Sequence, residues 1–463
     1  MRSLITLDSG SNKYSVLSVT TLGSLMAAVD STIVFLAVPA MAEYFKTGVS
    51  LLTLVIVMYI VTQTAMMIPS GTIGNRLGMK KIYLSGFGIF AVSSLIIALS
   101  PDITFAIFFR GVEGIGAGIL GTLGFPILLR SFPFEERGKA IGINSVSWSV
   151  GALIGPLLGG FLVTFDWRYI FLINVPIGIV GLILGISRIP KDTGDRSIKF
   201  RPSNFLTFLA FIILIVMGIS LLNYYYLIAG ALMFLPFYLV ERRDPLIPPK
   251  LLRNRSYYPI VMASGLQGIG FFGTIYVLSV YFQSDLGVSP IVAGILVAGY
   301  PVASIIANPL GGSLLDRSGR GSSLLVIGLV LQGIGIMVAA FILPHRYILT
   351  LPLFVAGFGG SIYWAVSTTL GVDAAGREFR AMASGTLYTI RNLSLALGIS
   401  LLPVFLDFFS SSSSATVIIL SSHVNMLTAA EYYMLFISVA SFASLPLFLM
   451  RFRTWEGISN PHA

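Results

Sequence analysis

Fourteen long apolar runs dominate this sequence of 463 residues. As a helix, a run of about 18 residues crosses the ~30 Å hydrocarbon core of a bilayer, at about 1.5 Å per residue. A strand of a membrane barrel would instead show about ten alternating residues. The runs therefore predict an all-α polytopic membrane protein. We expect spans near 15–40, 50–70, 82–100, 103–129, 139–164, 168–189, 204–222, 224–240, 257–283, 289–314, 322–343, 348–371, 381–407 and 431–451.

The composition supports this class and excludes several kinds of site. Only 10% of the residues are charged and 56% are hydrophobic, whereas soluble domains carry about 25% charged residues. There is no cysteine, and His345, His423 and His462 are too scattered for a metal cluster. No Gly-x-x-x-x-Gly-Lys loop is present, so we expect neither ATP-driven transport nor an enzyme active site. The first run is too apolar and too long for a cleaved signal peptide, and Asp30 interrupts it.

The net charge of +10 has a topological explanation. With the N-terminus inside, 24 of the 29 basic residues fall in cytoplasmic segments. Only Lys46, Arg168 and Arg346 lie outside, while Arg110 and Arg391 fall within spans. This asymmetry follows the positive-inside rule. It predicts a plasma-membrane protein with both termini cytoplasmic, in contact with anionic lipid and without a nucleic-acid partner.

One loop pattern occurs twice. It starts at Gly71 after the second span and at Gly312 after the tenth, so both copies face the same side. This repeat predicts two related halves of six spans, with 204–222 and 224–240 as an extra pair between them. The expected parts are an N-terminal bundle at 1–190, a two-helix insertion with its linkers at 191–256, and a C-terminal bundle at 257–463.

The repeated loop resembles the signature between helices two and three of the major facilitator superfamily. Its residues here are Gly71, Asn75, Arg76, Gly78 and Lys80 in the first copy, and Gly312, Asp316, Arg317, Gly319 and Arg320 in the second. The resemblance implies a latch that holds one access state, although positive-inside topology alone would also explain the charges. Asn75 replaces the usual acidic residue, so we expect Asp316 with Arg317 to carry more of the latch.

Four segments in the first half narrow the resemblance, at 29–34, 110–117, 151–160 and 167–178. The segments 29–34 and 167–178 resemble the fourteen-span drug:proton antiporter branch of the family, and 110–117 is similar to the Arg-x-x-Gln-Gly pattern of the superfamily as a whole. The Gly-Pro-x-x-Gly-Gly pattern within 151–160 is the one associated with antiport. Glu113 departs from the family pattern, because Gln is usual at its position.

Three charged residues inside spans are the sharpest candidates for proton coupling. Asp30 and Arg110 are both about 21 Å from the inner membrane face by helical rise, and Glu113 is one turn from Arg110. Intramembrane charges are costly, and they are functional candidates by default. We expect Asp30 and Glu113 to exchange protons while Arg110 tunes them. The structural alternative is a static ion-pair network.

The fifth span carries small residues at a spacing of four. Gly151, Gly155 and Gly159 line one face, next to Pro156 and Gly160. Such faces let helix backbones approach closely, and proline can kink a helix. We expect a gate at the interface between the two halves, with ordinary glycine-rich packing as the alternative.

Polar and aromatic residues within spans predict a central substrate cavity. The principal candidates are Tyr59, Gln63, Trp148, Gln267, Phe271, Tyr276, Asn308 and Trp364, and the same reasoning adds Phe272, Tyr363, Asn144, Gln332 and Arg391. Any single member has packing as its simpler explanation. An aromatic cavity suits hydrophobic substrates, including cations.

These observations predict a proton-coupled secondary transporter that exports hydrophobic, possibly cationic drugs or metabolites by alternating access. We expect it to act as a monomer, with protons and a small molecule as partners and the proton gradient in place of a cofactor. The alternatives are a symporter or uniporter for sugars or organic acids, and a non-transporting membrane sensor or scaffold.

Overall fold

The computed structural model describes residues 13–133, 136–197, 202–243, 249–343, 345, 348–409 and 426–449. All regular secondary structure within these ranges is helical. Fourteen helical segments in them are long and apolar enough to cross a membrane, which confirms the predicted number of spans. The two chain ends lie outside the described residues, so their predicted location stays a prediction.

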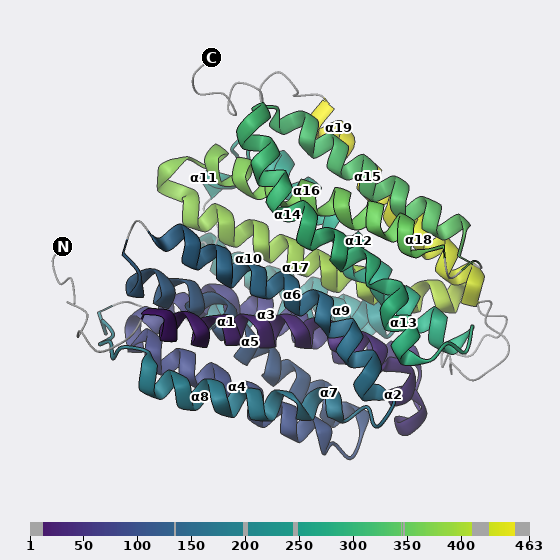
Figure 1. Ribbon diagram of the computed structural model, residues 1–463, viewed down its shortest axis with the longest axis horizontal. Coiled ribbons are helices and arrows are strands. Elements are labelled where there is room, and N and C mark those ends of the chain that lie inside the picture. Colours follow the sequence, from purple (N-terminus) through teal and green to yellow (C-terminus); the bar gives the residue numbers. More distant parts are fainter. Residues whose placement is uncertain are drawn as a thin grey trace.

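The helices form two bundles and a separate pair (Figure 1). The first bundle contains α1 (Lys13–Ile33), η1 (Val34–Leu36), α2 (Val38–Phe45), α3 (Val49–Leu77), α4 (Met79–Ala98), α5 (Ile103–Ser131), α6 (Arg137–Val163), α7 (Tyr169–Leu172) and α8 (Asn174–Arg188). The pair and its linker contain α9 (Pro202–Ser220), α10 (Tyr224–Arg243) and α11 (Pro249–Leu252). The second bundle contains α12 (Tyr258–Ser284), α13 (Pro290–Val297), α14 (Gly299–Ser318), α15 (Gly321–Phe341), α16 (Thr350–Ala374), α17 (Gly376–Phe408), α18 (Met426–Ala443) and α19 (Leu445–Leu449).

The first predicted span is shorter than expected. The helix α1 gives way to the 3-10 turn η1, and a new helix, α2, carries Pro39 in its first turn. Proline is favoured in the first turn of a helix, where a backbone N–H has no partner within the helix. In the interior of a longer helix that N–H would be needed. The membrane-spanning segment therefore ends at Leu36 rather than near residue 40.

The two copies of the repeated loop form the α3–α4 and α14–α15 turns. Gly78 and Gly319 occupy these turns with φ angles of 101° and 61°, a backbone conformation that side chains with a Cβ rarely adopt. The glycine spacing in the sequence therefore reflects a real turn requirement. We call the end of the molecule that carries these turns the basic end, because Arg76, Lys80 and Arg317 lie there, and we call the opposite end the far end.

The additional pair of helices lies at the junction of the two bundles. The helix α9 packs against α3 of the first bundle and α17 of the second, and α10 packs mainly on α9. Little of α10 is buried within the protein. Since its surface is apolar, lipid is its natural surrounding.

Close contacts between the bundles occur at the far end, where α2, α7 and α13 come together in Figure 1. The Phe35 ring of η1 packs on Phe272 and Tyr276 of α12, with centroid separations of 5.5 and 5.9 Å. The Tyr276 hydroxyl is 2.9 Å from the Thr53 hydroxyl of α3. These contacts join the two halves on the side opposite the basic turns.

Candidate functional site

A buried ion-pair network lies inside the first bundle. Arg110 on α5 donates from Nη1 to Asp30 Oδ2 on α1 at 2.7 Å and to Glu113 Oε2 at 2.6 Å. Its Nε donates to the Val55 carbonyl oxygen of α3 at 3.1 Å. All three ionisable side chains have no exposed surface. The depth argument from the sequence thus placed the right residues together, while their role in proton exchange stays a prediction.

Neutral side chains complete this network. Asn174 on α8 donates to Asp30 Oδ1 at 2.9 Å and to Ser94 Oγ at 3.2 Å, and Ser94 donates in turn to Glu113 Oε1. Sequence reasoning gave neither Asn174 nor Ser94 a role. The only signal was that Asn174 belongs to the 167–178 segment that carries the family resemblance. All four carboxylate oxygens therefore have a partner.

Aromatic rings enclose the guanidinium of this network. The Arg110 Cζ atom is 4.3 Å from the centroid of the Tyr59 ring and 5.5 Å from that of Phe171. The Tyr59 hydroxyl donates to the Ala27 carbonyl oxygen at 3.1 Å. Tyr59, predicted as a pocket residue, thus stabilises the network rather than facing a substrate.

The charge count of the network matters for its chemistry. Two carboxylates and one guanidinium carry a net charge of minus one when all are ionised, and the site is closed to solvent. Burial of a net charge is unfavourable, so one bound proton would neutralise the cluster. The network thus contains one more carboxylate than guanidinium, which is the feature on which the expected proton exchange depends.

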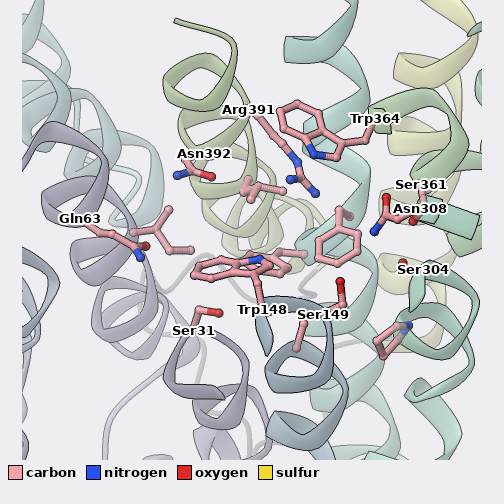
Figure 2. A pocket seen from close by; sticks show the side chains of 16 residues that line it. Ser31, Gln63, Trp148, Ser149, Ser304, Asn308, Ser361, Trp364, Arg391 and Asn392 are labelled. Carbon is pink, nitrogen blue, oxygen red and sulfur yellow. The ribbon is translucent and has the colours of Figure 1, made fainter. Parts of the chain in front are cut away.

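A cavity of about 100 Å³ lies between the two bundles (Figure 2). Its walls come from α1, α3 and α6 of the first bundle and from α12, α14, α16 and α17 of the second. The lining residues are Ser31, Ile60, Gln63, Trp148, Ser149, Ala152, Phe271, Phe272, Pro301, Ser304, Asn308, Ser361, Trp364, Arg391, Asn392 and Leu395. Five of the eight principal pocket candidates are among them, namely Gln63, Trp148, Phe271, Asn308 and Trp364.

Other pocket candidates lie outside the cavity, where their side chains hydrogen-bond to other residues of the protein. Gln267 donates to Gln332 Oε1 at 2.8 Å within the second bundle. The Tyr276 hydroxyl meets Thr53 at the far end, and the Tyr363 hydroxyl is 3.2 Å from Ser264 Oγ. None of these residues lines the cavity.

The cavity contains one charged residue, Arg391 on α17. Its Cζ atom is 4.0 Å from the Trp364 ring centroid and 5.7 Å from that of Phe271. Figure 2 shows the guanidinium reaching into the cavity beside Trp364. Arg391 was among the residues that the sequence added to the pocket candidates, and its charge inside a span was the available signal.

The glycine face of α6 packs differently from the expected gate between halves. A Cβ at Gly151 would lie 2.7 Å from Ala28 Cβ, and one at Gly159 would lie 2.6 Å from the Ile33 carbonyl oxygen. Gly155 likewise faces Val29 and Thr32, so all three glycines meet α1 of the same bundle. The face thus serves close packing within one half, because α6 is rotated so that its glycines lie against α1.

The contact between halves is made by the neighbouring part of the motif. A Cβ at Gly160 would lie 2.5 Å from the Pro290 carbonyl oxygen of α13, and one at Gly294 would lie 2.6 Å from that of Pro156. The backbones of α6 and α13 therefore touch at the far end, with no room for side chains. Only Pro156 and Gly160 of the predicted motif contribute to this contact.

The first loop motif is held by a residue outside it. Asp192, which follows α8, accepts hydrogen bonds from the backbone N–H groups of Met79 at 2.6 Å and Lys80 at 3.0 Å. A carboxylate at a helix N-terminus is electrostatically favourable. Arg130 Nη1 is 3.7 Å from the same carboxylate. Asp192 thus supplies the negative charge that Asn75 lacks, and no motif pointed to it because it lies more than 110 residues away.

The second copy of the loop makes fewer contacts. Asp316 and Arg317 are exposed, and within the described ranges neither side chain forms a hydrogen bond or an ion pair. The latch expected from this pair is not formed in this conformation. Among the described residues, no cluster of His, Asp and Glu is arranged to hold a metal ion.

The comparisons with known proteins agree with this architecture. The sequence pattern of the Major Facilitator Superfamily matches residues 20–246 and 260–456, so the chain belongs to this family. It is a multi-pass membrane transporter and not an enzyme.

Two relatives and two solved structures illustrate the similarity. The riboflavin transporter RibZ of Clostridioides difficile (strain 630) is 29% identical over 413 residues, covering 86% of this chain and 89% of RibZ. The putative multidrug resistance protein MdtD of Escherichia coli (strain K12 / DH10B) is 27% identical over 444 residues, or 92% of each chain. A peptide transporter, POT, in complex with sulfate has a TM-score of 0.70 at 14% identity, covering 96% of this chain and 95% of its own. The xylose transporter XylE from E. coli, in a partially occluded inward open conformation, has a TM-score of 0.62 at 15% identity, covering 95% and 99%.

Proposed function

We propose that this transporter is a proton-coupled antiporter that exports hydrophobic small molecules. The observation that carries the proposal is the closed network of Asp30, Arg110 and Glu113, which holds two carboxylates for one guanidinium. The network lies beside the cavity, because Ser31 lines the cavity and directly follows Asp30. The relatives named as a riboflavin transporter and a putative multidrug resistance protein support a small organic substrate.

The orientation that we propose rests on the charge asymmetry. Under the positive-inside rule the basic end would face the cytoplasm and the far end the outside, with the protein in the plasma membrane. The far end is closed by Phe35 on Phe272 and by the α6–α13 contact. The substrate would therefore enter the cavity from the cytoplasmic side or the inner leaflet.

Alternating access then needs the far-end contacts to open and the basic end to close. A proton that arrives from outside would neutralise the network, and its release inside would restore the net negative charge. Glu113 is hydrogen-bonded to Ser94 of α4 and Asp30 to Asn174 of α8, while Arg110 donates to the Val55 carbonyl oxygen of α3, so a change in the charge of the network would alter how these helices pack. This is the route by which proton binding would bias the two conformations.

The test is proton movement in proteoliposomes. The purified protein is reconstituted with a pH-sensitive dye inside, a pH gradient is imposed, and aromatic organic molecules of positive, zero and negative charge are supplied in turn. The proposal expects substrate to move against its gradient only while protons move down theirs. Asp30→Asn and Glu113→Gln, made separately, should each abolish this exchange.

Two outcomes would contradict the proposal. Full proton-driven exchange in both variants would remove the network from coupling. Substrate uptake that ignores the pH gradient would favour a uniporter for sugars or organic acids instead. The exposed α10 variant Tyr225→Phe is the control, because Tyr225 is 66% exposed and distant from the network in sequence.

The α6–α13 contact gives a second test of the same cycle. Gly160→Leu adds a side chain where the Pro290 backbone lies, so it should hold the far end apart and slow exchange. Gly121→Leu on α5 is a matched control, since a Cβ there would meet nothing within 4 Å.

A further inference from the structure

The side chains that line the central cavity carry a single charge, and it is positive. Arg391 is the one charged residue among its sixteen lining residues, and none of them is an acid. The remaining polar groups are neutral amides, hydroxyls and indoles. A ligand in this cavity therefore faces one positive charge and several hydrogen-bonding groups.

Arg391 is not neutralised by the protein. Its Nε is buried without a hydrogen-bond partner, and within the described part of the chain its side chain has no ion pair. Asp30 and Glu113 are not available to it, because all their oxygens are engaged in the first bundle. On α17 itself, Glu378 and Asp407 are at least ~19 Å away along the helix axis.

The cation is held in place by aromatic rings rather than by a counter-ion. It lies 4.0 Å from the centroid of Trp364 and 5.7 Å from that of Phe271. Such contacts offset only part of the cost of removing a charge from water. A guanidinium also presents a planar fork of N–H groups, which matches a carboxylate or a phosphate.

We infer that the substrate of this transporter is an organic anion with an aromatic body, whose acid group pairs with Arg391 and whose ring lies among Trp148, Phe271 and Trp364. This rests on the proposed function and names its substrate class. The aromatic residues alone predicted hydrophobic substrates including cations. The unpaired guanidinium disfavours a cation, because two like charges would share a cavity of about 100 Å³.

Neutral hydrogen-bonding groups would serve the rest of the ligand. Ser304, Asn308 and Ser361 are grouped on the second-bundle side of the cavity in Figure 2, and Gln63 lies on the opposite side. Amides and hydroxyls can donate or accept, so they tolerate different substituents. Arg391 would thus select the acid group of the ligand, while the neutral groups would tolerate different ring substituents.

The experiment measures binding without any gradient. The full chain in detergent is titrated with 4-nitrobenzoate, 4-nitrobenzamide and 4-nitrobenzylammonium, which share one ring and differ in charge. Quenching of tryptophan fluorescence reports binding, since Trp148 and Trp364 line the cavity. The Kd of the anion should be at least tenfold lower than that of the cation, with the amide between them.

Two variants assign this preference to Arg391. In Arg391→Gln the anion should lose its tenfold advantage, and in Arg391→Lys most of it should remain. Equal or tighter binding of the cation by the unaltered protein would overturn the inference, and so would an undiminished preference in Arg391→Gln. The three-ligand comparison on the unaltered protein decides the matter even if a variant fails to fold.

This outcome is separate from that of the proposed function. If the anion binds through Arg391 but never moves with protons in proteoliposomes, the coupling proposal fails and the substrate class stands. If exchange is proton-driven but only for cations, the substrate class fails and the coupling stands.

Discussion

Arg110 and Arg391, two arginines within membrane-spanning helices, illustrate two ways to keep a cation inside a membrane protein. Arg110 in the first bundle is paired with Asp30 and Glu113 at 2.7 and 2.6 Å and has no exposed surface. Arg391 in the second bundle has aromatic neighbours and no carboxylate among the described residues. The first arginine belongs to a closed network that exceeds neutrality by one negative charge, and the second leaves its charge for a ligand.

Under the two proposals above, this difference separates proton exchange from substrate recognition. The network around Arg110 would exchange a proton without touching the substrate, and Arg391 would bind the substrate without exchanging a proton. The cavity between the bundles is where the two meet, since Ser31 follows Asp30 and lines the same space as Arg391.

The largest expected effect is the loss of the closed network. Arg110→Met leaves two buried carboxylates without their cation, and breaking a buried pair typically costs about 3–5 kcal/mol. We expect a large drop in the thermal unfolding temperature of the purified protein in detergent. Arg130→Met on the same helix is the control, because Arg130 is 58% exposed and 3.7 Å from Asp192, so about 0–1 kcal/mol is expected. Equal losses in the two variants would contradict the contrast.

A smaller effect is expected from the neutral partner of Asp30. Asn174→Leu removes the amide that donates to Asp30 Oδ1 at 2.9 Å, and a hydrogen bond to a charged group contributes about 1.5–3 kcal/mol. Thermal unfolding should show a loss between those of Arg110→Met and Arg130→Met. The control is Ile183→Leu on α8, where the side chain is 59% exposed. A loss no greater than that of the control would mean that Asn174 does not support the network.

The third prediction concerns a variant in which the protein itself supplies a carboxylate partner for Arg391. Leu395 lies one helical turn after Arg391 and lines the same cavity, so Leu395→Glu places a carboxylate within reach of the guanidinium. The affinity for 4-nitrobenzoate should fall at least tenfold, or about 1.4 kcal/mol. Leu395→Gln has nearly the same shape without the charge and should retain most of the preference for the anion. If Leu395→Glu and Leu395→Gln bind 4-nitrobenzoate equally well, the cavity does not recognise the charge of the ligand.

The smallest expected effect concerns the uncharged pair of the second bundle. Gln332→Leu leaves Gln267 without its 2.8 Å partner, and a neutral hydrogen bond contributes about 0.5–1.5 kcal/mol. The double variant Gln267→Leu/Gln332→Leu should be no less stable than the single one, because it leaves no unpaired amide. Thermal unfolding of the four proteins in this cycle measures the coupling. If Gln332→Leu lost as much thermal stability as Arg110→Met, the charged network of the first bundle would contribute no more to stability than this uncharged pair.

Much of the fold and part of the site could be predicted from the sequence. Run length alone gives the fourteen spans, and helical rise places Asp30 and Arg110 at one depth. The partners Asn174 and Ser94 could not be found this way. A charged residue in a span is unusual because its burial is costly, whereas a neutral residue in a span is not unusual. Asp192 was also missed, since its role depends on the segment after α8 folding back to the start of α4.

The pocket candidates show the limit most clearly. Tyr59 and Gln63 are both on α3, yet Tyr59 covers Arg110 and Gln63 lines the cavity. In a bundle surrounded by lipid, the outward faces of helices are as apolar as the inward ones, so periodicity does not reveal the rotation of a helix. The expected position of the α6 glycine face between the halves was wrong for the same reason, because its spacing predicted close packing but not the identity of the neighbour.

The sequence by itself determined that the solvent is lipid, how many helices cross it, and which few charges lie inside it. These properties depend on local composition and on the length of each run. The tertiary structure decided which of those charges is neutralised, because compensation depends on which helices touch. Two arginines that look equivalent along the chain thus differ in their surroundings: one is enclosed by carboxylates of α1 and α5, and the other faces a cavity without an acid.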